Sequence, residues 1–191
     1  MSVPEKVFLF SGHMVDAPDR KQPRFPLGHA GDAAAAIASA LDACQAGTSD
    51  LALTQGAAGG DLLFCEAAQA RGLRVQLLQP FPEPEFLCRS VDPSAGAWRP
   101  RYAAVAARLT DPPRALQAVR GPLAAGADPY VECNLWLLDE ALSYGADRLR
   151  FVCLWNGGGG DGPGGTAHMV QVVRDAGGQV IWLDTRVLFG I

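Results

Sequence analysis

Short apolar runs alternate with glycine-rich loops and helix-like segments along most of this chain. In residues 51–80 an apolar run, a glycine-rich turn, a helical pattern and a second apolar run follow one another. About thirty residues is the length of a crossover that joins two parallel strands through a helix. Runs that predict strands lie at 7–10, 51–54, 75–78, 149–155 and 180–183. Helical patterns lie between them at 33–44, 62–71, 130–144 and 166–176. This alternation predicts an α/β fold with a doubly wound parallel sheet of about five strands.

The 191 residues are predicted to form a single domain. Residues 83–129 interrupt the pattern, with two short helical stretches between prolines and glycines. This segment is too short to build a core of its own. We therefore interpret it as a small helical insertion, or cap, within the domain 1–191.

Charge and hydropathy exclude several classes of partner. The net charge of −4 leaves no general basic surface, so duplex nucleic acid is not an expected partner. No apolar run reaches the length of a membrane span, and the N-terminus lacks the pattern of a signal peptide, so a cytoplasmic protein with no membrane partner is expected.

The cysteines and histidines indicate the redox state of the thiols and whether a metal site is expected. Five scattered cysteines, with no CxxC pair, predict reduced thiols at positions 44, 65, 88, 133 and 153. No HxH or HExxH spacing occurs, so no metal site and no resident cofactor are expected.

Three loops that leave strand ends have a composition suited to ligand binding. They are Ser11-Gly12-His13, the segment 55–61 and the segment 156–166. In a parallel sheet, ligands bind outside the carboxyl ends of the strands, and helix starts offer free N–H groups to anions. In the second loop, Gly56, Gly59 and Gly60 would let the backbone approach a ligand closely. Their spacing matches neither GxGxxG nor a Walker A loop, and a tight turn that needs glycine only for its geometry is the alternative.

The third loop is longer than a structural turn requires. It holds seven glycines between positions 157 and 165 and ends at Thr166, which can cap the next helix. Anion binding is predicted at Gly164, Gly165 and Thr166, and a surface loop without a ligand is the alternative. His13, Asn134 and His168 are predicted as further ligand contacts; for the two histidines a purely structural position is the alternative.

Two stretches together resemble a known family. Leu53-Thr54-Gln55-Gly56-Ala57-Ala58-Gly59-Gly60-Asp61 with Glu66-Ala67-Ala68 is similar to the first nucleotide-binding half of the SLOG superfamily, Rossmann-like domains related to the LOG or lysine-decarboxylase-like proteins and to DprA. Gly162-Pro163-Gly164-Gly165-Thr166 resembles the PGG-x-GT loop of that family. The resemblance implies a Rossmann-like fold and a nucleotide-like ligand, such as a nucleoside phosphate or an ADP-ribose-like molecule. It also implies a sensor role, with a second copy of the chain or a signalling protein as a partner.

One departure from the family bears on catalysis. Catalytic LOG members carry a glutamate three residues after the threonine of this loop and use it, with an arginine, to cleave an N-glycosidic bond; Met169 stands there in this chain. A methionine can neither activate water nor stabilise a cationic transition state. The resemblance therefore favours ligand binding without that chemistry.

Two other functions stay open. One is an N-glycosidic hydrolase or transferase that uses Glu66 or Asp61 as its carboxylate; a helix cap is the alternative for Asp61 and a solvated or inter-helix face is the alternative for Glu66. The other is a partner-binding domain with a vestigial pocket. Trp98 and Tyr102 could stack on a base or pack in a core, and Trp155 and Trp182 are expected in the core.

Overall fold

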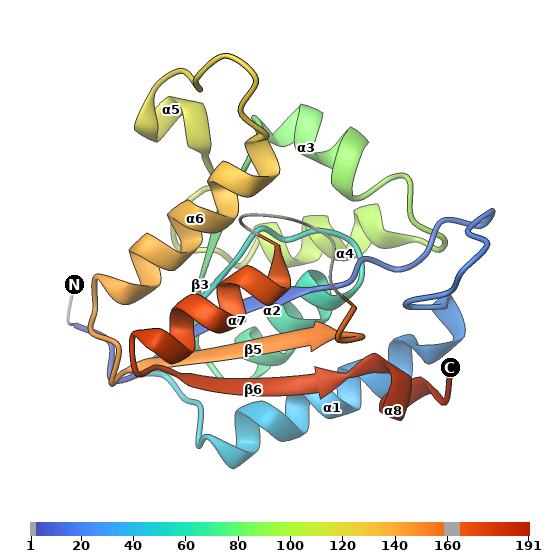
Figure 1. Ribbon diagram of the computed structural model, residues 1–191, viewed down its shortest axis with the longest axis horizontal. Helices are drawn as coiled ribbons and strands as arrows, with labels where there is room; N and C mark the ends of the chain where they lie inside the picture. The colour runs from blue at the N-terminus through green and yellow to red at the C-terminus, as the bar shows by residue number, and fades with distance from the viewer. Residues whose placement is uncertain (1–2, 159–164) are drawn as a thin grey trace.

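The computed structural model describes residues 3–158 and 165–191, which form one open sheet with helices on both faces (Figure 1). The strands within these ranges are β1 (Val7–Gly12), β2 (Leu51–Thr54), β3 (Arg74–Gln79), β4 (Arg114–Ala115), β5 (Leu149–Trp155) and β6 (Gln179–Asp184). Neighbouring strands are parallel throughout, in the order β4-β3-β2-β1-β5-β6. The predicted doubly wound parallel sheet is thus confirmed, with six strands instead of about five.

The helices follow the strands in the predicted rhythm. They are the 3-10 turn η1 (Leu27–His29), α1 (Ala30–Ala43), α2 (Gly60–Ala70), α3 (Glu83–Ser90), α4 (Trp98–Ala106), α5 (Leu116–Arg120), α6 (Pro129–Leu142), α7 (Thr166–Asp175) and α8 (Thr185–Phe189). The longer helices agree with the sequence patterns to within a few residues. The short elements η1, β4, α5 and α8 have no counterpart among the predicted segments.

Strand β1 lies at the centre of the sheet and is covered on both sides. Phe8 and Phe10 point into a core shared with α1, α2 and α4, whereas Val7 and Leu9 point into a second core shared with α6 and α7. All four side chains are at most 1% exposed. Burial on both faces explains why such a strand is a continuous apolar run without polar alternation.

The segment 83–129 is not purely helical. Its two-residue strand β4 extends the sheet beside β3, where Leu78 pairs with Arg114. Trp98 and Tyr102, on α4, are buried in the first core, so they pack there and do not offer a surface for a base. Trp182 lies on β6, at the opposite edge of the sheet, and is 44% exposed. The expectation that Trp182 lies in the core is therefore wrong.

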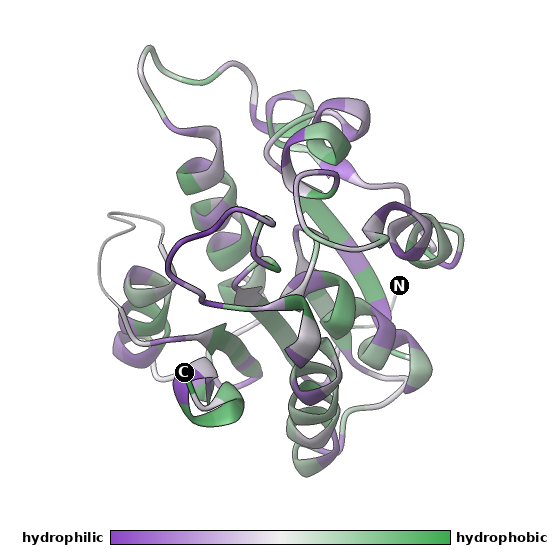
Figure 2. Ribbon diagram, turned by 90° about the vertical axis from the view of Figure 1, so that its right-hand side faces the viewer, coloured by the Kyte–Doolittle hydropathy of each residue, from purple (hydrophilic) through white to green (hydrophobic). Residues whose placement is uncertain are grey.

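The strand order creates a switch point at the carboxyl ends of the central strands. From β1 the chain winds one way through β2 and β3, and β5 and β6 lie on the other side. Figure 2 looks onto this end of the sheet and shows a polar segment crossing in front of it. We call this segment, residues 13–26 between β1 and η1, the strap.

Two remaining sequence expectations concern cysteines and membranes. Cys44, Cys65, Cys88, Cys133 and Cys153 are all free thiols, as predicted. In the part of the chain that the structure describes, no helix has both the length and the apolar character needed to cross a membrane.

Candidate functional site

A pocket of about 420 Å³ opens at the switch point. Its wall combines the end of β1, the turn after β2, the strap, the end of α3, and the starts of α6 and α7. The lining residues are Phe10, Ser11, Gly12, His13, Met14, Arg24, Gln55, Ala57, Asp61, Ser90, Asp128, Tyr130, Val131, Asn134, Gly165 and Thr166. The starts of α2, α6 and α7 all reach this wall, and helix starts carry partial positive charge.

The structure brings most of the predicted site residues together and leaves some outside. Those that line the pocket are Ser11, Gly12, His13, Asp61, Asn134, Gly165 and Thr166. Those that do not line it are Gly56, Gly59, Gly60, Glu66 and His168. Gly164, with the rest of 159–164, lies outside the described residues.

The glycines of the turn after β2 serve backbone geometry. Gly56 and Gly59 both have positive φ, at 86° and 95°. A Cβ on Gly59 would lie 2.5 Å from the backbone nitrogen of Val15 in the strap, and the Gly60 N–H donates to the His13 carbonyl at 3.2 Å. The contacts of Gly59 and Gly60 therefore explain both glycines by close packing against the strap and need no ligand.

The side chain of Asp61 stabilises this turn through hydrogen bonds to its backbone. Helix α2 begins at Gly60, and its N-cap residue is Gly59, so the expectation that Asp61 caps the helix is wrong. Instead its Oδ2 accepts hydrogen bonds from the N–H groups of Gly56 and Ala57, both at 3.2 Å. Residues before the helix are thereby held in the turn that leads to the pocket.

The carboxyl of Asp61 is the strongly perturbed acid of this wall. Its residue is 6% exposed, and burial raises its pKa from the ordinary 3.8 to about 6, although the hydrogen bonds from Ala57 and Gly56 act in the opposite direction. A carboxyl group with such a pKa is mostly ionised at neutral pH and becomes protonated in mild acid. Perturbed acids in pockets are common at functional sites.

Glu66, five residues further along α2, has a different environment. Its carboxylate forms a bidentate ion pair with the guanidinium of Arg101 on α4, with Arg101 Nε 2.7 Å from Glu66 Oε1. Both side chains are about one-third exposed. Glu66 thus joins the insertion to α2 and does not reach the pocket.

The start of α7 forms another part of the wall. Gly165 is the N-cap residue, with an extended backbone at φ −67° that does not itself require glycine. The Thr166 hydroxyl does not cap the helix; it lies 3.2 Å from the Ser11 hydroxyl, so the ends of β1 and α7 meet there. Met169, in the position of the family's catalytic glutamate, is fully buried in the second core.

His13 joins the two central strands. Its N–H donates to the Leu154 carbonyl at 2.9 Å, and its ring Nε2 accepts a hydrogen bond from the Asn156 N–H at 3.2 Å. Accepting at Nε2 requires that nitrogen to be unprotonated. His13 is therefore at once a structural residue and part of the pocket wall.

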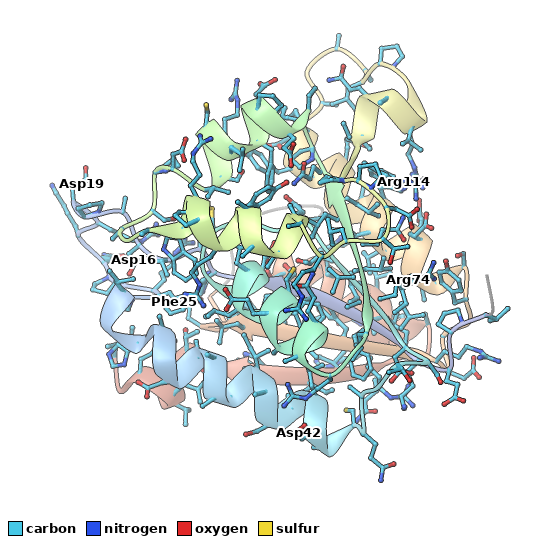
Figure 3. All side chains as sticks on the ribbon, turned by 180° about the vertical axis from the view of Figure 1, so that it is seen from behind. Asp16, Asp19, Phe25, Asp42, Arg74 and Arg114 are labelled. Atoms are coloured by element: carbon cyan, nitrogen blue, oxygen red, sulfur yellow. The ribbon has the colours of Figure 1, made fainter. Side chains whose placement is uncertain are left out.

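Sequence reasoning missed Arg24, the cation contributed by the strap. The carboxylate of Asp16 accepts hydrogen bonds from the N–H groups of Arg24 and Phe25, at 2.9 and 3.0 Å, and so folds the strap back on itself. Figure 3 shows Asp16 and Phe25 together in this segment. The Asp16 carbonyl also accepts from the Ala95 N–H at 3.3 Å, which ties the strap to the insertion.

Tyr130 was also missed, although its helix was predicted. Asp128 caps α6 by accepting from the N–H groups of Tyr130 and Val131, and Pro129 occupies the first turn. The Tyr130 hydroxyl lies 3.2 Å from the Ser90 hydroxyl, and its ring lies edge-on to Phe81, with centroids 5.3 Å apart. Tyr130 is 36% exposed and lines the pocket.

Two amides add polar atoms between these groups. The side-chain NH₂ of Gln55 donates to the side-chain oxygen of Asn134 at 2.7 Å, which joins the turn after β2 to α6. Glu132, which the sequence places beside Asn134, instead lines a smaller cavity of about 200 Å³ next to α5.

Within residues 3–158 and 165–191, no three His, Cys, Asp or Glu side chains are grouped so that they could hold a metal. No protein-family model matches this chain, and a search of curated proteins finds no match either.

Proposed function

We propose that the protein binds a nucleotide or a nucleotide-derived small molecule, such as a nucleoside phosphate or an ADP-ribose-like molecule, in the pocket at the switch point. The observation that carries this proposal is the composition of the pocket wall. The start of α7, the Ser11 and Thr166 hydroxyls and the Arg24 guanidinium can bind an anion, and Tyr130 can pack on a base. A sensor role rests on the family resemblance.

Titration calorimetry with adenosine 5′-monophosphate, ADP-ribose and adenosine tests this function. We expect the two phosphorylated compounds to bind and adenosine to bind at least about tenfold more weakly, since it lacks the charged hydrogen bonds. Ribonucleotides with other bases are titrated in the same series, so that a preference for a base other than adenine is also detected. Failure of every nucleotide to bind would refute the proposal.

Arg24→Gln removes the cation that the strap contributes to the pocket wall. It should weaken binding of a phosphorylated compound by about tenfold. Lys21→Gln is the matched control, because Lys21 is an exposed cation of the same strap that does not line the pocket. Equal effects of the two substitutions would indicate a general charge effect and no contact with Arg24.

Cleavage of an N-glycosidic bond is a second candidate function. Asp61 is a better candidate than Glu66 for the carboxylate that this reaction needs. Asp61 lines the pocket with a pKa of about 6, in the range of a carboxyl that can transfer a proton near neutral pH, whereas Glu66 is paired with Arg101 elsewhere. Release of free base from nucleosides, nucleoside monophosphates or NAD tests this activity. Asp61→Asn should abolish it and Glu66→Gln should leave it unchanged.

A further inference from the structure

The groups of the pocket wall follow the order of the strands. Thr166 and Ser11 meet between the ends of β5 and β1, and Asp61 lies after β2. Tyr130 lies on the far side, because its contacts Phe81 and Ser90 both follow β3. Adjacent strands are about 4.8 Å apart. Asp61 is therefore placed between the end that can bind an anion and the end that can pack on a base.

Asp61 is the buried acid of the pocket wall. Its Oδ2 accepts hydrogen bonds from the N–H groups of Gly56 and Ala57, and hydrogen bonds from Thr54 and Gln55 also favour the charged form of the carboxyl. The residue is more than nine-tenths buried and also forms part of the pocket wall. An ionised acceptor in such a place is stabilised by a donor from the ligand and repels a second anion.

The parts of a nucleotide match this order. Its phosphate is the anion, its base is the flat apolar part, and the ribose between them carries two hydroxyl groups that can donate to a carboxylate. Resting on the function proposed above, we propose that Asp61 is a specificity-determining residue that accepts a hydrogen bond from the 2′- or 3′-hydroxyl of the ligand's ribose. The pocket then selects ribonucleotides over their deoxy counterparts.

A comparison of the affinities of related ligands for the unaltered protein tests this directly. Adenosine 5′-monophosphate is compared by calorimetry with its 2′-deoxy and 3′-deoxy forms, or the corresponding set is used for whichever ribonucleotide binds. We expect at least one deoxy form to bind about tenfold more weakly, the effect of losing one hydrogen bond to a charged group. Equal binding of all three compounds overturns the inference, and this arm needs no variant that might fail to fold.

Asp61→Asn then assigns the selectivity to the carboxylate. The ratio of ribo to deoxy affinity should fall toward one in this variant and stay unchanged in Glu66→Gln, a carboxylate on the same helix outside the pocket. A ratio that persists in folded Asp61→Asn overturns the assignment. Failure of all nucleotides to bind the unaltered protein is a different result, which refutes the proposed function itself.

Discussion

Replacing Asp61 by asparagine should stabilise the protein at neutral pH. Burial raises the pKa of this carboxyl to about 6 from an ordinary value of 3.8. That difference corresponds to about 3 kcal/mol by which folding is penalised once the group is ionised, at about 1.4 kcal/mol for each tenfold change in acidity. Asparagine keeps an acceptor oxygen for the N–H groups of Gly56 and Ala57, but accepts less strongly, which offsets about 1 kcal/mol. A net gain of about 2 kcal/mol remains.

The pH dependence identifies the cause. Between about pH 4 and pH 6 the folded protein holds a proton on Asp61 that the unfolded chain has lost, so this group's contribution to stability is lost as the pH rises through that window. Urea unfolding of the unaltered protein and of Asp61→Asn is measured at intervals from pH 4 to pH 8, and the two free energies are subtracted at each pH. The pKa values of Asp42, Asp92 and Asp184 are lowered by neighbouring arginines, and their contributions cancel in this difference.

We expect the advantage of Asp61→Asn to grow from pH 4 to pH 6 and then to level off. A difference that stays constant across the whole range would refute the reasoning, because it would mean that Asp61 titrates at the same pH in both states. A charge kept at such a cost in stability is typical of residues that serve binding or catalysis.

Three further predictions concern other parts of the site. Gly59→Ala should destabilise the protein by about 2 kcal/mol or more in urea unfolding, since the backbone φ is 95° and the new Cβ would meet the Val15 nitrogen, while Gly28→Ala, with open space around it, should have little effect. Thr166→Ala should weaken nucleotide binding by about 0.5–1.5 kcal/mol in calorimetry, the range for one neutral hydrogen bond, and an unchanged affinity would remove its hydroxyl from the site. Glu66→Gln should leave nucleotide affinity unchanged and alter stability by no more than about 1 kcal/mol, as expected for a partly exposed ion pair; a large loss of affinity would contradict its placement outside the pocket.

Local patterns were sufficient for the central part of the fold. The run from Val7 to Phe10 predicts a buried strand, and the prediction is correct because helices cover both faces of the sheet and such a strand is apolar throughout. Strand β4 could not be found this way: it consists of Arg114 and Ala115, which are held by pairing with β3 and form no apolar run. Helix α8 is five residues long and begins at a cap in which Asp184 accepts from the Arg186 N–H, a signal too short to predict a helix.

The candidate site was predictable where it follows directly from topology. Loops after parallel strands meet at one edge, which places Ser11, Asp61 and Thr166 in one pocket. Arg24 could not be predicted, because the path of the strap depends on contacts with distant segments, such as the bridge between Met14 and Gly59. The glycine pattern after β2 is compatible with a ligand-binding loop or a tight turn, and the positive φ and close packing against the strap explain Gly59 by the turn.

A crystal structure of the protein with a bound ribonucleotide tests the central claim most directly. The account predicts density for the ligand in the pocket at the switch point, with a phosphate oxygen within hydrogen-bond distance of the Thr166 N–H and of the Ser11 hydroxyl. It also predicts a ribose hydroxyl on Asp61 and the base beside Tyr130. A nucleotide bound elsewhere on the protein, or seated in this pocket with its phosphate against Asp61, would contradict it.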